Sequence, residues 1–241
     1  MIRWVVVLAV LAQPVQANAP ADSLRPVARS VAISVAEVPA QAASTEVKKE
    51  RKGLFSALRP KNRPKSVGQA KICGDPALDG KIVAPIQGTI RGCGVAAPVR
   101  LTSVSGVALS RPAIMDCTTA KALKKWIKTG AQPALSKRGG VKSLDVVAHY
   151  ACRTRNNQKG AKISEHGKGR AIDIAGMTAG DGSQITLLKG WNSRRDGPAL
   201  KKMWRAACGP FGTVLGPNSN RFHLDHFHFD TARYRSGPYC R

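Results

Sequence analysis

Residues 164–173 and 223–228 hold four of the chain's five histidines, so the side chains best suited to metal chemistry are concentrated in two short stretches. A zinc site needs a few nitrogen, sulfur or oxygen donors that converge on one point, and a catalytic zinc keeps one position open for water. His166, Asp173 and His228 are candidates for three such donors. A single histidine is more often a surface or core residue, and the spacing of His166 and Asp173 alone is a weak signal. The clustering nevertheless favours a metal site over a structural role.

The second stretch offers a further role through side-chain alternation. His226 and His228 are two residues apart, so on a strand they would project from the same face. One of them could then bind the metal while the other lies beside the metal-bound water.

The elements that must position these residues are short and separated by many turns. Helices are expected where a capping residue precedes an apolar stripe, and strands where short apolar runs lie between Gly and Pro. The pattern predicts helices over 116–129, ending at Gly130, and 198–208, and strands over 82–86, 95–101, 144–150, 171–175, 184–188 and 222–229. We therefore predict an α+β domain with a small, mostly antiparallel sheet flanked by helices.

The N-terminal part of the chain has a different composition. Residues 1–19 combine a positive start, a short apolar core and small-residue cleavage sites, which is typical of a secretory signal peptide. Residues 20–70 contain few large apolar side chains and a basic run, which predicts a disordered linker. The folded domain is then expected over 71–241. No later segment resembles a transmembrane helix, so we expect a periplasmic or secreted protein.

The formal charge of +25 favours anionic partners such as nucleic acid, acidic lipid headgroups or cell-wall polymers. The export signal makes nucleic acid the weaker choice. The basic linker could bind an anionic envelope surface, or it could be a merely solvated segment.

The six cysteines include no C-x-x-C pair, so disulfides in an oxidising compartment are favoured over a zinc finger. Sequence alone allows 15 pairings. The simplest expectation is sequential pairing, which would join Cys73 to Cys93, Cys117 to Cys152 and Cys208 to Cys240.

Two motifs carry a resemblance to a known group of enzymes. Ser-x-His-x-x-Gly-x-Ala-x-Asp at 164–173, followed by His-x-x-His-x-His at 223–228, resembles the zinc peptidases that cut bacterial cell-wall peptides. That superfamily includes D-alanyl-D-alanine carboxypeptidases and the penicillin-insensitive murein endopeptidase. The wider domain, over most of 71–241, resembles the bacterial extensin-like C-terminal family, notably at 153–157, 164–174 and 223–230.

The resemblance implies a set of roles. His166, Asp173 and His228 match the zinc ligands, His226 matches a histidine next to the metal, and His223 matches the first histidine of the endopeptidase motif. The general base is open between His226 and Asp225, and strand alternation favours His226. Arg153 resembles an arginine that contacts the substrate or the developing oxyanion. Glu165 and Asp230 could orient the ligand histidines or lie in solvent, and His149 is expected to be structural.

These residues predict an exported zinc-dependent hydrolase that cuts the peptide crosslinks of peptidoglycan, with an endopeptidase preferred to a carboxypeptidase. The first alternative is a non-catalytic, basic cell-wall-binding module that retains the metal-site fold. The second alternative is a secreted nucleic-acid or lipid-surface binder driven by charge, whose binding would weaken steeply with salt.

Overall fold

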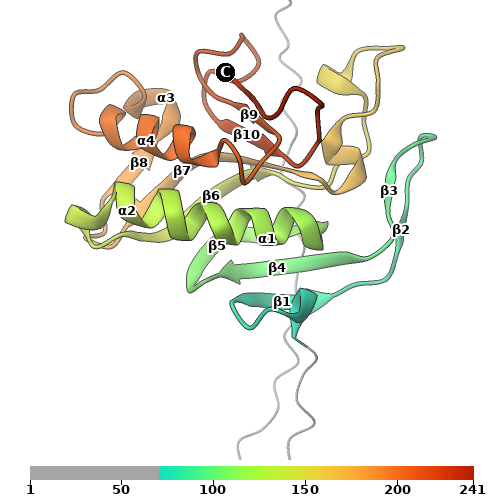
Figure 1. Ribbon diagram of the computed structural model, residues 1–241, viewed down its shortest axis with the longest axis horizontal. Coiled ribbons are helices and arrows are strands. Elements are labelled where there is room, and N and C mark those ends of the chain that lie inside the picture. The colour runs from blue at the N-terminus through green and yellow to red at the C-terminus, as the bar shows by residue number, and fades with distance from the viewer. Residues whose placement is uncertain (1–70) are drawn as a thin grey trace, which may run out of the picture. The chain divides into compact units, whose positions relative to one another are not determined.

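The computed structural model describes residues 71–241, so the expected signal peptide (1–19) and linker (20–70) lie outside the described residues. A nine-stranded sheet has the order β1-β4-β5-β6-β7-β10-β9-β11, with β8 also pairing with β7 (Figure 1). The sheet strands are β1 (Leu78–Ile82), β4 (Pro98–Val104), β5 (Val107–Asp116), β6 (Val141–Ala148), β7 (Ala171–Ala179), β8 (Gln184–Thr186), β9 (Thr213–Leu215), β10 (Phe227–Asp230) and β11 (Tyr239–Cys240). A separate hairpin pairs β2 (Ile86–Gln87) with β3 (Gly94–Val95).

Most neighbouring strands of the sheet are antiparallel, and the parallel pairs are β5 with β6 and β9 with β11. The helices are α1 (Cys117–Trp126), α2 (Gln132–Ala134), α3 (Leu187–Gly190) and α4 (Gly197–Ala207). The α+β prediction is therefore confirmed. Within residues 71–241, the structure contains no helix of the length and hydrophobicity needed to cross a bilayer.

Helix α1 begins where the sequence predicts but does not stop at Gly130. The carboxylate of Asp116 accepts a hydrogen bond from the backbone N–H of Thr119 at 2.7 Å, which caps the helix. The chain then continues through a π-helical turn, Ile127–Ala131. A Cβ atom at Gly130 would lie 2.7 Å from the Cβ of Ala206, so this glycine allows α4 to approach closely.

The central strands β7 and β10 alternate between two faces. Ile172, Ile174, Phe227 and Phe229 are fully buried in the hydrophobic core. The indole of Trp126 from α1 meets the ring of Phe229 edge-on, with centroids 5.1 Å apart. Because strand residues alternate, the residues between them project from the opposite face, away from α1.

One strand prediction near the site differs from the structure, and one strand was missed. The expected strand over 222–229 begins only at Phe227. The side-chain oxygen of Asn220 accepts a hydrogen bond from the backbone N–H of Phe222 at 2.9 Å, and this contact forms a turn in place of the strand. The alternation argument therefore does not reach Asp225 or His226. The long strand β5 was not predicted, since Pro112 interrupts its apolar pattern.

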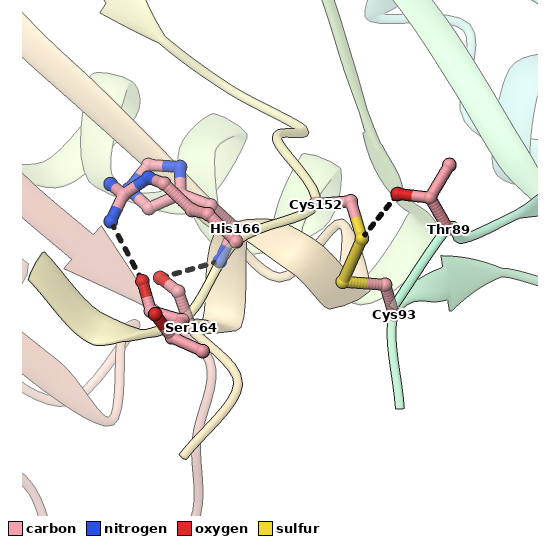
Figure 2. Close-up of a disulfide and its surroundings, with 7 residues drawn as sticks. Thr89, Cys93, Cys152, Ser164 and His166 are labelled. Carbon is pink, nitrogen blue, oxygen red and sulfur yellow. Dashed lines mark hydrogen bonds between the residues drawn. A yellow bond between two sulfur atoms is a disulfide. The ribbon is translucent and has the colours of Figure 1, made fainter. Parts of the chain in front are cut away.

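The disulfides join Cys73 to Cys117, Cys93 to Cys152 and Cys208 to Cys240. Sequential pairing is thus wrong for two of the three bonds. Cys73 lies before β1 and Cys117 opens α1, and the sheet brings these segments together across 44 residues. Cys93 reaches Cys152 beside the turn that carries His166, where Thr89 donates a hydrogen bond to the Cys152 sulfur (Figure 2).

Candidate metal centre

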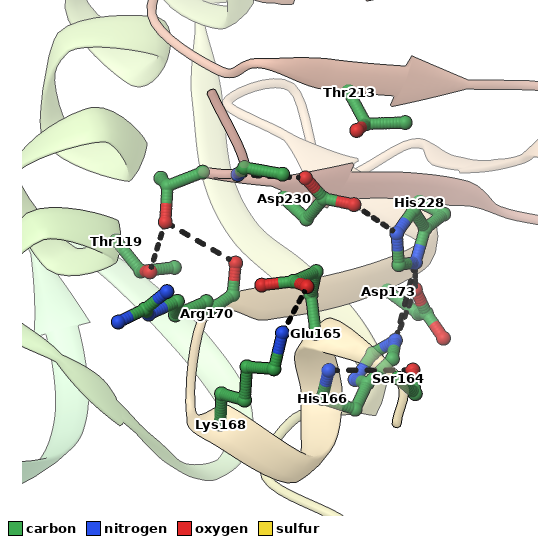
Figure 3. A network of polar contacts seen from close by, with 12 residues as sticks. Thr119, Ser164, Glu165, His166, Lys168, Arg170, Asp173, Thr213, His228 and Asp230 are labelled. Atoms are coloured by element: carbon green, nitrogen blue, oxygen red, sulfur yellow. Dashed lines mark hydrogen bonds and ion pairs between the residues drawn. The ribbon is translucent and has the colours of Figure 1, made fainter. Parts of the chain in front are cut away.

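The side chains of His166, Asp173 and His228 converge on one point (Figure 3). Nε2 of His166 lies 3.1 Å from Oδ1 of Asp173 and 3.1 Å from Nδ1 of His228. Nδ1 of His228 lies 2.8 Å from the same Asp173 oxygen. All three residues offer ligand atoms within 4.8 Å of one another, so this group could hold a metal ion.

Two of these residues are fixed by strand pairing. His228 on β10 lies directly opposite Asp173 on β7 in the antiparallel register. Residues that face each other in such a pair have neighbouring side chains on the same face. The register between the two strands therefore places the side chains of Asp173 and His228 in contact.

His166 comes from a short 3-10 turn, Glu165–Lys168, that precedes β7. Ser164 caps this turn, and Gly169 ends it with a left-handed φ of 67°. A Cβ atom at Gly167 would lie 2.9 Å from the sulfur of Cys93, so this glycine lets the turn pack on the Cys93–Cys152 disulfide. Steric fit thus explains Gly167, and the left-handed backbone explains Gly169.

Outer contacts orient both histidine rings. The backbone carbonyl of His149 accepts a hydrogen bond from Nδ1 of His166 at 2.7 Å, which leaves Nε2 toward the centre. The carboxylate of Asp230 accepts from Nε2 of His228 at 3.1 Å, which leaves Nδ1 toward the centre. Metal-binding histidines usually have such a partner on the second ring nitrogen. Glu165 instead accepts a hydrogen bond from Lys168 at 2.7 Å.

The cluster is electrostatically coupled. Burial would raise the pKa of Asp173, but hydrogen bonds from His166 and His228 outweigh it and hold that pKa far below its usual range. Burial lowers the pKa of His228, yet Asp173 and Asp230 raise it to about 9 in the metal-free protein. Burial, with the charges of His228 and His226, lowers the pKa of His223 to about 4. Asp173 is therefore a carboxylate and His223 a neutral imidazole near neutral pH.

The donor set fits a zinc ion. Two imidazole nitrogens and one carboxylate oxygen are typical protein ligands of catalytic zinc. Tetrahedral bonds of about 2.0–2.1 Å place ligand atoms roughly 3.3 Å apart. The observed separations of 3.1, 3.1 and 2.8 Å are slightly shorter, so a small outward movement of the side chains would accommodate the ion.

The remaining histidines of the second stretch lie beside this cluster. Nε2 of His226 is 3.8 Å from Oδ2 of Asp173, and its Nδ1 is 2.8 Å from Oδ1 of Asp225. The Asp225 side chain is 62% exposed, whereas that of His226 is 17% exposed. The ring of His223 lies 5.2 Å from that of His226, and its Nδ1 is 2.8 Å from the side-chain oxygen of Asn220.

The cluster lies in a cleft of about 620 Å³, a size typical of ligand-binding pockets. Arg153 also lines the cleft, where its guanidinium donates to the backbone carbonyl of Thr154 at 3.4 Å. The structure therefore brings all seven predicted site residues to this cleft or its edge, with Asp225 at the edge through its contact with His226.

Residues 79–241 match the family model described as Extensin-like protein C-terminus. The chain belongs to this family. Comparison with curated proteins and with solved structures gives no match.

Several cleft residues of this extensin-like domain were not predicted from the sequence. They come from loops, from the short strand β9 and from the C-terminal segment. They are Arg155, Asn156, Asn157, Thr213, Leu215, Asn220, Phe222, Tyr234 and Tyr239. The local signal for Asn220 was its position three residues before His223, where an asparagine can form a side-chain turn.

Proposed function

We propose that this extensin-like domain is an exported zinc-dependent peptidoglycan hydrolase that cleaves the crosslinks between stem peptides. The observation that carries the proposal is the convergence of His166, Asp173 and His228 in an open cleft, beside a histidine held by a carboxylate. A binding module would need neither the convergent donors nor the adjacent pair of His226 and Asp225.

His166, Asp173 and His228 would hold the zinc ion. When bound there, zinc would polarise a peptide carbonyl and make water acidic enough to act as a nucleophile near neutral pH. The carbonyl of His149 and the carboxylate of Asp230 would keep the two imidazoles in the ligating orientation.

His226 is the better candidate for the general base. Its Nε2 faces the ligand cluster, while Asp225 accepts a hydrogen bond from the opposite ring nitrogen at 2.8 Å. In this arrangement His226 takes a proton at Nε2 and later passes it to the leaving amine. Asp225 fixes the tautomer and stabilises the protonated ring, as a carboxylate does in other catalytic pairs with histidine.

Arg153 would bind a carboxylate of the peptide or offset negative charge on the reacting carbonyl. The endopeptidase preference rests on the resemblance of residues 223–228 to the murein endopeptidase motif. Export rests on the sequence of residues 1–19, and the three disulfides are suited to an oxidising compartment.

The test is the muropeptide profile of purified sacculi incubated with the zinc-loaded protein, with a chelated sample as the matched control. We expect crosslinked dimers to disappear only in the zinc-loaded sample. An unchanged profile, with the protein bound to sacculi in both samples, would reject hydrolysis and favour a non-catalytic wall-binding module.

A further inference from the structure

The cleft has an aromatic wall, defined as Phe222, Tyr234 and Tyr239. These are all of the exposed aromatic side chains in residues 71–241, with 41%, 44% and 48% of their surface accessible. All of them line the cleft that contains His166, Asp173 and His228. Tyr150 and Trp204, which lie outside this cleft, are only partly exposed. The grouping of the most exposed aromatic side chains at one cleft indicates a binding site.

Backbone and hydroxyl contacts hold the segments that carry two of these rings, Tyr234 and Tyr239, although the rings are exposed. Tyr239 lies on β11 opposite Thr213 of β9, and its N–H donates to the carbonyl of Gly212 at 2.7 Å. The next residue, Cys240, is tied to Cys208 by a disulfide. The hydroxyls of Tyr234 and Thr213 are hydrogen-bonded at 3.0 Å. At Tyr234 and Tyr239 a ligand therefore meets preorganised residues, which lowers the entropy lost on binding.

Cations accompany the rings. The guanidinium of Arg221 lies 4.9 Å from the centre of the Phe222 ring, and that of Arg241 lies 5.6 Å from the centre of the Tyr239 ring. The cleft also includes Arg153, Arg155 and two asparagines, Asn156 and Asn157. Its lining thus combines flat apolar faces with hydrogen-bond donors and positive charge.

A pyranose ring matches this combination. One face of the sugar presents C–H groups that stack on an aromatic ring, while its rim presents hydroxyl, amide and carboxylate groups. The lining offers little aliphatic surface to an apolar peptide side chain, since Leu215 is its one aliphatic residue.

We propose that the aromatic wall binds a sugar ring of the glycan strand to which the stem peptide is attached. This inference rests on the proposed function and specifies its substrate as a glycan-linked peptide in preference to a free peptide. The aromatic wall would hold the sugar while the peptide bond lies at the His166–Asp173–His228 site.

The first test compares two substrates, a crosslinked disaccharide–peptide and the same crosslinked peptide after removal of the sugars. We expect kcat/KM to be about tenfold higher for the sugar-bearing substrate, from stacking on one or two rings. Tyr239→Ala and Phe222→Ala should reduce the ratio of the two kcat/KM values toward one, and Tyr239→Phe should keep this ratio. Leu188→Ala, at an exposed residue outside the cleft, is the matched control and should leave the ratio unchanged. Equal kcat/KM for both substrates in the unaltered protein would overturn the inference while leaving hydrolysis intact.

A second test separates the two proposals. The disaccharide of N-acetylglucosamine and N-acetylmuramic acid, without peptide, is titrated into the protein and into Tyr239→Ala. Binding that the substitution weakens about tenfold supports the aromatic wall even if neither substrate is hydrolysed. Binding that is absent, or unchanged by the substitution, overturns the inference whatever the protein does to peptides.

Discussion

The two faces of the β7–β10 strand pair perform opposite tasks with neighbouring residues. On the covered face, Ile174 and Phe229 are completely buried beneath the helices. On the open face, Asp173 and His228 are directly paired and contribute two of the three candidate metal donors. The core of one face thus supplies the rigidity that the other face needs to hold a metal geometry. Substitutions one residue apart should therefore affect different properties of the protein.

The largest effect is expected from Asp173→Asn on the open face. The amide keeps the shape of the side chain but removes the charged ligand, so zinc content and crosslink hydrolysis should fall to the level of the chelated protein. Metal analysis and muropeptide profiles measure the two losses, and circular dichroism checks that the fold persists. Full zinc content in this variant would contradict the assigned ligand set.

Substitution of the histidine beside the cluster should remove activity without removing metal. His226→Ala should lower kcat by about 10²–10⁴, the range expected for loss of a general base, at unchanged zinc content. Asp225→Asn should lower kcat less, because Asp225 acts through His226. If Asp225→Asn removes activity while His226→Ala retains it, the base is Asp225.

The covered face should show the reverse behaviour. Phe229→Ala removes a buried ring packed on Trp126 and Phe211, which should reduce the free energy of unfolding by about 3–5 kcal/mol. Urea unfolding in the presence of a chelator measures the loss of stability. In a separate sample without chelator or urea, the folded variant should still bind zinc at the original stoichiometry. Leu188→Ala on the surface, as control, should change stability by less than about 0.5 kcal/mol.

A smaller effect is expected at Asp230, which orients the His228 ring through a hydrogen bond. Asp230→Asn keeps an oxygen near Nε2 of His228 but removes the charge, so zinc affinity should fall about tenfold. Competition with a chromogenic chelator measures it. Asp145→Asn makes the same charge change at an exposed residue of β6 and should leave the affinity unchanged. Equal affinities in the two variants would show that Asp230 does not support the ligand.

Zinc binding should also depend on pH. The pKa of His228 is about 9 in the metal-free protein, so its ring is protonated at pH 7 and must release that proton to bind zinc. Affinity should rise up to about tenfold per pH unit from pH 7 and level off above about pH 9. The raised pKa stabilises the metal-free fold fully below about pH 6.5, and this contribution is lost as pH rises through 9. Titration calorimetry and scanning calorimetry at several pH values test the two statements. An affinity independent of pH would contradict the first, and a metal-free stability that does not fall between about pH 6.5 and pH 9 would contradict the second.

The covered face was largely predictable from the sequence. The capping residue and apolar stripe over 116–129 indicated the helix that contributes Trp126, and the pattern over 222–229 indicated the strand that contains β10. These signals are local, because capping and side-chain periodicity depend on residues a few positions apart. The same local signals overextended the strand toward Phe222, where a side-chain turn at Asn220 competes with the strand.

The sequence by itself determined which residue types are present and how neighbours alternate, and therefore the candidate ligands and the α+β class. Only the tertiary structure decided that His166 meets His228 across 62 residues, and that Cys93 pairs with Cys152 and not with Cys73. It also decided that Phe222, Tyr234 and Tyr239 share a cleft with the cluster. Such contacts depend on strand register and on burial of a whole core at once, and these are properties that no short stretch of sequence contains.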